Sequence, residues 1–140
     1  MTEQTNAEKV TVTMTIDVVI DPMWIEHVTG GPEGMVDVFL GGYSGYWLEG
    51  VEHDEKLGWL AYEFGAEDRH STRKEKEAAS KAWHAGEPLP KHFHALNLEA
   101  AKKSWVAGVQ KYGMDWFENG DGCTYDCALQ LGILNEIVYG

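Results

Sequence analysis

One stretch near the start of the chain alternates strictly between apolar and polar side chains. Its apolar residues stand at every even position from 10 to 20, and threonine or aspartate fills most of the positions between them. A period of two is typical of a β-strand with one buried face, and β-branched side chains suit a pleated surface. The sequence therefore predicts a strand over residues 10–20, preceded by a flexible leader at residues 1–9.

Local capping and turn signals divide the rest of the chain. Asp21-Pro22 is an N-cap followed by proline at the first helical position, so a short helix is expected at residues 22–28 and should end at Gly30-Gly31. Alternating residues predict a hairpin, with strands over residues 46–52 and 60–64 and a polar turn between them. Ser71, Asn97 and Thr124 are expected to cap later helices. The remaining predicted elements are helices at 32–40, 72–84, 98–116 and 125–139, and an extended connection or edge strand at 89–96.

These elements indicate a fold class. The chain has 140 residues, of which 44% are hydrophobic, and this is enough for one real core. The sequence predicts an α+β fold, with a small antiparallel sheet of three or four strands packed against three or four helices. A single compact domain is expected over residues 10–140.

The chain is acidic, with a formal net charge of −12, and the charge is unevenly distributed. Residues 1–65 carry −10, residues 66–104 carry +2 and residues 105–140 carry −4. Because affinity for nucleic acid comes mainly from Lys and Arg that neutralise phosphates, a nucleic-acid partner is not expected. A basic protein partner is easier to bind.

Apolar runs and cysteines bear on location. The longest apolar runs are far shorter than the roughly 18 residues of a membrane span, and the polar start of the chain does not resemble a secretory signal. Cys123 and Cys127 are too few and too close for the disulfide framework of a secreted mini-protein. The sequence predicts a cytoplasmic protein without membrane contact.

The aromatic residues suggest a binding surface. Six tryptophans are more than one modest core needs, so some of them are expected at the surface. Aromatic side chains beside the glycine-rich bend at residues 41–45 are flanked by acidic residues, and such a surface can anchor a protein partner or stack a base. Core packing is the alternative explanation. The candidate binding residues are Tyr43, Tyr46, Trp47 and Trp59.

A zinc site is one alternative that the residue types raise. His92 and His94 would share one face of a strand, and Cys123 and Cys127 would share one face of a helix or its start, which makes two pairs of possible ligands. The cysteine spacing is not the usual knuckle, and Cys127 stands where the apolar stripe needs a small buried residue. We therefore expect surface histidines and a core cysteine, without a metal or other cofactor.

A calcium loop is a second alternative. Asp115, Glu118, Asp121 and Asp126 cluster around two glycines, but Phe117 would occupy the third ligand position and Asp126 replaces the closing glutamate. An ordinary turn between two helices is expected here.

The sequence contains no complete catalytic signature. The pairs His53-Asp54 and His70-Ser71 have no third group nearby in the sequence, and the bend at residues 41–45 is not followed by the residues of a phosphate-binding loop. No catalytic residue is assigned.

The segment 125–140 and the tripeptide Gly45-Tyr46-Trp47 resemble small proteins of tailed bacteriophages, notably those that infect actinobacteria. The resemblance covers the second predicted strand and the last predicted helix. It implies a phage origin, a similar α+β fold and an accessory role directed at the host, and it transfers no catalytic residue.

These observations lead to three hypotheses for the function. The first is a non-enzymatic accessory protein that binds and modulates a host protein, for example to inhibit a defence system. The second is a module that binds or sequesters a nucleotide-like small molecule, for which the middle segment supplies cations. The third is a metal-dependent enzyme of unknown type. The apolar strand and the tryptophans also make a homodimer a reasonable expectation. The cations of the second hypothesis are Arg69, Arg73, Lys74 and Lys76.

Overall fold

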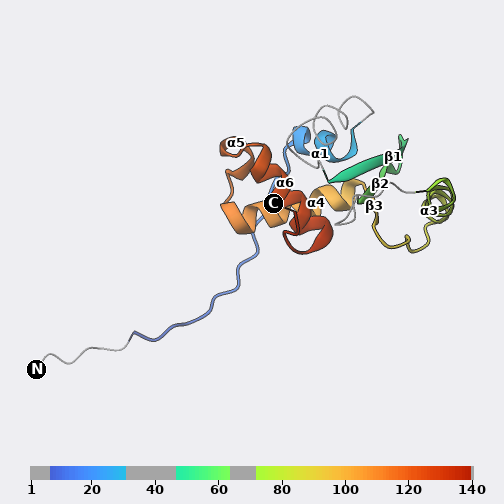
Figure 1. Ribbon diagram of the computed structural model, residues 1–140. Helices are drawn as coiled ribbons and strands as arrows, with labels where there is room; N and C mark the ends of the chain where they lie inside the picture. The colour runs from blue at the N-terminus through green and yellow to red at the C-terminus, as the bar shows by residue number, and fades with distance from the viewer. Residues whose placement is uncertain (1–6, 31–46, 64–71, 140) are drawn as a thin grey trace, which may run out of the picture.

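A computed structural model describes residues 7–30, 47–63 and 72–139 of the protein. Within these residues, five helices and a three-stranded antiparallel sheet pack together in an α+β fold (Figure 1). The predicted fold class is confirmed, with one helix more than the three or four expected. Within the described ranges, none of the helices combines the length and the hydropathy needed to cross a membrane. The elements are α1 (Pro22–Thr29), β1 (Leu48–Asp54), β2 (Gly58–Glu63), α3 (Arg73–Ala85), β3 (Phe93–Leu96), α4 (Leu98–Tyr112), α5 (Trp116–Asn119) and α6 (Gly122–Leu134).

The sheet has the order β1-β2-β3, so β2 is its central strand. The predicted hairpin is confirmed, because β1 and β2 pair antiparallel across a tight turn. Asp54 shapes this turn, since its Oδ1 accepts hydrogen bonds from the backbone N–H groups of Lys56 at 2.8 Å and Leu57 at 3.0 Å. β3 pairs antiparallel with β2 and forms the other edge, as the extended segment around the two prolines suggests.

Caps decide where several helices begin and end. Asp21 accepts a hydrogen bond from the N–H of Met23 at 2.9 Å and caps α1, and Asn97 accepts one from Ala100 at 3.0 Å and caps α4. Gly86 ends α3 with a φ of 69°, a left-handed conformation that glycine adopts without a Cβ clash. These predicted caps are confirmed.

The two faces of the sheet carry separate hydrophobic clusters. Trp59 and Ala61 of β2 and Leu96 of β3 face the layer of α1, α4 and α6. Leu60 and Tyr62, which alternate with them, face α3 on the opposite side. Figure 1 shows α3 set apart from the other helices. The central strand is therefore covered on both faces, which explains why all six residues of β2 are buried.

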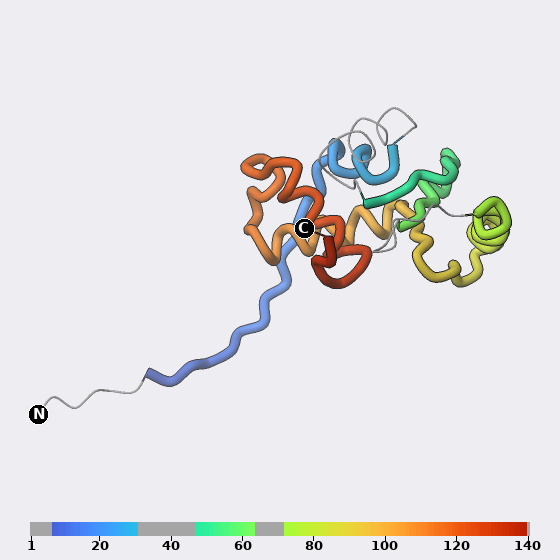
Figure 2. Tube along the Cα trace, viewed as in Figure 1, coloured from blue at the N-terminus to red at the C-terminus, as the bar shows by residue number. Residues whose placement is uncertain are grey.

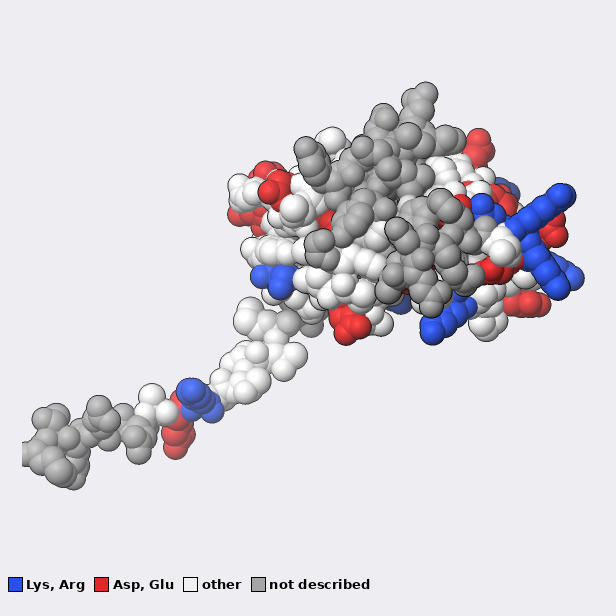
Figure 3. All heavy atoms as spheres, in the orientation of Figure 1, with Lys and Arg blue, Asp and Glu red and all other residues white. Residues whose placement is uncertain are grey.

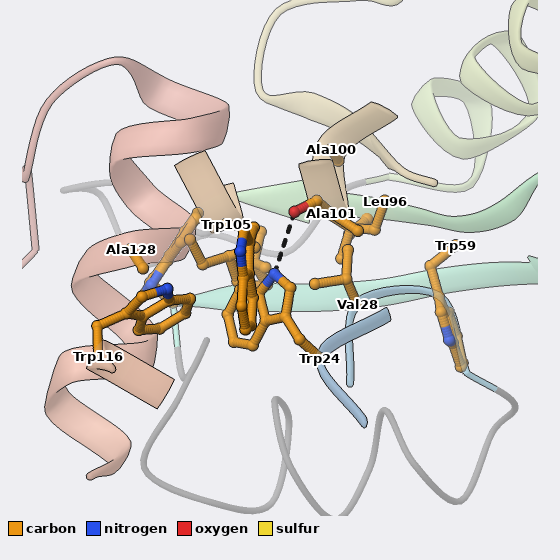
Figure 4. Close-up of a cluster of buried hydrophobic side chains, with 13 residues drawn as sticks. Trp24, Val28, Trp59, Leu96, Ala100, Ala101, Trp105, Trp116 and Ala128 are labelled. Carbon is orange, nitrogen blue, oxygen red and sulfur yellow. Dashed lines mark hydrogen bonds between the residues drawn. The ribbon is translucent and has the colours of Figure 1, made fainter. Parts of the chain in front are cut away.

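Tryptophans fill the larger cluster. Trp24 is fully buried, and its Nε1 donates to the carbonyl of Ala101 and to Ser104 Oγ, both at 3.1 Å (Figure 4). Its ring meets that of Trp116 edge-on, with centroids 5.0 Å apart. Gly108 makes room for this cluster, since a Cβ at that position would lie 2.4 Å from the Trp116 ring. Bulky rings are thus accommodated by small residues on the neighbouring helix.

The predicted strand at residues 10–20 is wrong. In the described chain, these residues are extended but belong to no strand, and the three strands of the sheet lie elsewhere in the sequence. Figure 2 shows the segment running away from the body. Val18 and Ile20 are its side chains that pack on the core. Alternation indicates that a segment can join a sheet, but pairing also requires a neighbouring strand. The described residues place no strand beside this segment.

Several helix boundaries also differ from the predictions. Thr72, not Ser71, caps α3. The predicted helix at 98–116 ends at Tyr112, because Gly113 has a φ of 100°, and the short α5 follows. The last helix begins at Gly122, where Asp121 and Thr124 form a capping box, and it ends before the left-handed residue Asn135. The predicted helix at 32–40 and the bend at 41–45 lie outside the described residues.

Candidate functional site

A buried carboxylate with three polar partners stands at the end of β2. Glu63 Oε2 is 3.0 Å from His94 Nε2 and 3.4 Å from His92 Nδ1, and Tyr139 donates its hydroxyl hydrogen bond to Glu63 Oε1. The antiparallel pairing of β2 with β3 brings Glu63 and both histidines together. At the end of β2, two imidazoles and a phenol therefore contact the same carboxylate.

The environment of Glu63 favours its ionised form. Burial alone would raise the pKa of this carboxyl, but the hydrogen bonds from Tyr139, His94 and His92 together outweigh burial and hold the pKa below its ordinary value. An ionised carboxylate only accepts hydrogen bonds, so His94 donates through Nε2. Glu63 thus fixes the tautomer and orientation of the His94 ring.

His92 adopts an unusual backbone conformation beside this carboxylate. Its φ is 71°, in the left-handed region that few residues other than glycine and asparagine visit. The same residue accepts a backbone hydrogen bond from the N–H of Glu63 at 2.8 Å. In this conformation, just before β3, the carbonyl of His92 accepts a hydrogen bond from β2 while its ring lies beside the Glu63 side chain.

A second polar network holds Tyr139 in place. Gln130 of α6 is fully buried, and its Oε1 accepts hydrogen bonds from the N–H groups of Val138 and Tyr139, each at 2.8 Å. Gln130 Nε2 donates to Asp126 Oδ2 at 2.9 Å, and Asp126 Oδ1 accepts from Trp47 Nε1 at 2.6 Å. The Trp47 and Tyr139 rings are stacked. One chain of contacts therefore connects β1, α6 and the C-terminal residues to Glu63.

A pocket opens beside these residues. Its volume is about 330 Å³, and it lies along β3, between the start of α4 and the end of α6. Among the described residues that line it, none carries a hydroxyl or thiol nucleophile, and His94 is its link to Glu63. The walls combine apolar and polar side chains and are formed by Leu89, Phe93, His94, Ala95, Asn97, Glu99, Ala100, Lys103, Gly132 and Ile133.

The predicted aromatic binding surface is wrong for two of its four residues. Trp47 is 2% exposed and Trp59 is 7% exposed, so neither ring is open to a partner. Trp59 Nε1 donates to the carbonyl of Gly30 at 2.5 Å, and Trp47 is held by Asp126. Tyr43 and Tyr46 lie outside the described residues. Both tryptophans are therefore core residues, each with its indole N–H bonded inside the protein.

The four residues considered for zinc contact different partners. His92 and His94 contact Glu63. Cys127 instead forms a hydrogen bond with Tyr112, and burial together with this bond raises the pKa of Tyr112 to about 12. Cys123 is exposed at the start of α6. Among the described residues, no group of three or more histidine, cysteine or acidic side chains is arranged to hold a metal.

The other sequence candidates have structural partners. Asp121 caps α6 and Asp126 is buried against Trp47, so these carboxylates serve the turn and the core. Arg73 pairs with Glu77 at 3.1 Å and Lys76 pairs with Glu49 at 2.9 Å. Their charges are thereby partly compensated, which weakens the case for a phosphate site at the middle segment.

Sequence analysis missed Glu63, Gln130 and Tyr139. The alternation of His92 and His94 correctly indicated that both rings point to the same side, although His92 precedes β3 and only His94 lies on it. Their acidic partner Glu63 lies on β2. A useful signal would have been the position of Glu63 at the end of the central strand, where an acid among apolar residues needs hydrogen-bond partners.

The ionised state of Glu63 leads to a pH prediction. Because its folded pKa lies below the ordinary value of 4.5, its stabilising contribution is present above pH 4.5 and is lost as the pH falls through the folded pKa. We expect E63Q to lower the free energy of unfolding by about 1.5–3 kcal/mol at pH 7. The difference from the unmodified protein should shrink steadily in urea unfolding measured from pH 5 to pH 3.

The exposed pair on α3 provides the control. Glu77 contacts Arg73 on an exposed helix face, so E77Q should change stability by less than about 0.5 kcal/mol at any pH in this range. If E63Q and E77Q gave the same pH profile, Glu63 would not be a stabilising carboxylate.

A scan of the chain against models of protein families, a search of curated proteins and a search of solved structures find no match.

Proposed function

We propose that the protein is a non-enzymatic binding protein that takes up an extended segment of a partner protein as a fourth strand beside β3. The observation that carries this proposal is that the pocket lies along an edge strand of the described sheet. β3 is the last strand of the described sheet, and the pocket of about 330 Å³ runs along it. Strand addition to a sheet edge is a common mode of peptide recognition.

The hydrogen-bond pattern of β3 supports this geometry. The N–H of Glu63 bonds the carbonyl of His92, so in the antiparallel register the backbone groups of His94 and Leu96 also face β2. The backbone groups of the alternate residues then face away from the sheet. Ala95 is the central one of these, and it lines the pocket.

The side chains around the pocket offer both affinity and selectivity. Leu89, Phe93 and Ile133 supply apolar contacts, while Glu99 and Lys103 supply charges of opposite sign. The net charge of −12 favours a basic partner. With the resemblance to phage proteins, the proposed partner is a protein in the cytoplasm of an infected bacterial host.

The test selects peptides from a random library displayed against the whole protein. Peptides that bind as a strand should slow hydrogen exchange of the Ala95 N–H, which faces the groove. A95P removes this donor without removing a bond to β2, and we expect it to weaken binding of the same peptides about tenfold or more.

A variant on the other side of the sheet is the control. K81A changes an exposed residue of α3 and should leave peptide affinity unchanged. Circular dichroism checks that A95P is folded. Selected peptides that leave the Ala95 amide unprotected, or that bind A95P as tightly as the unmodified protein, would contradict strand addition at this groove.

A further inference from the structure

The extended segment that precedes α1 exposes a row of apolar side chains. Val10 is 78% exposed, Val12 72%, Met14 74% and Ile16 61%. The segment projects from the body in Figures 1 and 2, and on the face seen in Figure 3 mostly uncharged atoms lie between the charged residues near its start and the body. An exposed apolar row of this kind marks an interaction surface.

The two sides of this segment differ in chemistry. Its even positions are apolar, and its odd positions from Lys9 to Asp17 are polar. Val18 and Ile20 continue the apolar side and pack on the core of the body. The segment therefore has the side-chain pattern and the backbone conformation of a strand, and it lacks a paired strand among the described residues.

We propose that residues 9–17 pair antiparallel with the same residues of a second copy of the chain, with the two-fold axis at Thr13. In this register Val10 lies opposite the second copy's Ile16, and Val12 lies opposite its Met14. Threonines 11 and 15 face each other on the polar side. A two-fold interface uses the same patch twice, so a segment that reads alike in both directions suits it.

The charges at the ends select this register. Lys9 lies opposite Asp17 of the second copy at both ends of the paired segment, and opposite charges across a strand pair are stabilising. Moving the axis to Met14 would keep the apolar sides aligned, but it would place Lys9 opposite Val19 and Asp17 opposite Thr11. Within one extended chain Lys9 and Asp17 are about 26 Å apart and cannot pair.

The paired segments also account for the apolar row. Each copy contributes four apolar side chains to the same side of the two-stranded ribbon, next to Val18 and Ile20 on each body. Across the ribbon, Val10 packs beside the second copy's Ile16 and Val12 beside its Met14, and such cross-strand pairs stabilise a two-stranded ribbon. This association is independent of the groove beside β3, and either proposal can fail without the other.

Charge exchange tests the register. K9D and D17K each place like charges at both ends of the ribbon, and we expect each to weaken association about tenfold in sedimentation equilibrium. The double variant K9D/D17K exchanges the two charges and should restore the association of the unmodified protein. A monomeric unmodified protein, or a double variant that associates as weakly as the single ones, would overturn the proposal.

Cysteine cross-linking tests the direction of the strands. Cys123 and Cys127 are first replaced by alanine. Two T13C chains should then form a disulfide with each other. A T11C chain should form one with a T15C chain but not with a second T11C chain. Parallel pairing would instead cross-link T11C to itself. If residues 9–17 paired with β3 instead, two T13C chains would not cross-link. Either of these two results would overturn the proposal.

Discussion

Replacing Trp24 with alanine is expected to lower the free energy of unfolding by about 3–5 kcal/mol. The side chain is fully buried between α1 and α4, and its ring contacts those of Trp116 and Phe117. Truncation would leave a cavity surrounded by rigid rings, and it would remove the donor to Ala101 and Ser104. Since small domains are stable by about 5–15 kcal/mol, urea unfolding of W24A should show a much lower midpoint.

The variant W24F separates packing from hydrogen bonding. Phenylalanine keeps much of the ring contact but loses the Nε1 donor and the second ring of the indole, so its expected cost is about 1–2 kcal/mol. If W24F were as destabilised as W24A, the two hydrogen bonds and not the aromatic packing would hold this part of the core.

Local rules predicted those parts of the fold that depend on neighbouring residues. The caps at Asp21 and Asn97, the end of α3 at Gly86 and the hairpin of β1 and β2 each need only a few consecutive side chains. The error at residues 10–20 has the opposite cause. Periodicity within one segment predicts a strand and its two faces. Which strand lies beside it depends on how the rest of the chain folds.

The tryptophans show a second limit of sequence analysis. An excess of aromatic residues suggested an exposed surface, yet all six tryptophans are buried. In the larger cluster, the rings pack with small residues of the helices, Ala100, Ala101, Gly108 and Ala128, which is a relation between helices. Spacing along one helix indicates which face is apolar but not how deep a pocket the next helix leaves.

The candidate site was predictable only in part, for the same reason. The spacing of His92 and His94 directs both rings to one side, and Glu63 follows once the register of β2 with β3 is known. Tyr139 reaches Glu63 from beyond the end of α6, where Asn135 turns the chain in a left-handed conformation. Sequence analysis extended the helix through this turn and therefore placed Tyr139 on a helix.

Replacing Gln130 with alanine is the second substitution for which a large effect is expected, about 3–4 kcal/mol of unfolding free energy. Its amide is buried and makes hydrogen bonds to Asp126 and to the backbone of Val138 and Tyr139. Truncation would leave two N–H groups and a buried carboxylate without this partner. Urea unfolding measures the loss of stability.

Hydrogen exchange shows where the loss acts. The amides of Val138 and Tyr139 should exchange faster in Q130A, because Gln130 Oε1 is their acceptor. Q110A, which truncates an exposed glutamine of α4, should change stability by less than about 0.5 kcal/mol and leave both amides protected. Equal effects of the two substitutions would mean that Gln130 does not anchor the C-terminal residues, and Tyr139 would then need another reason to stay on Glu63.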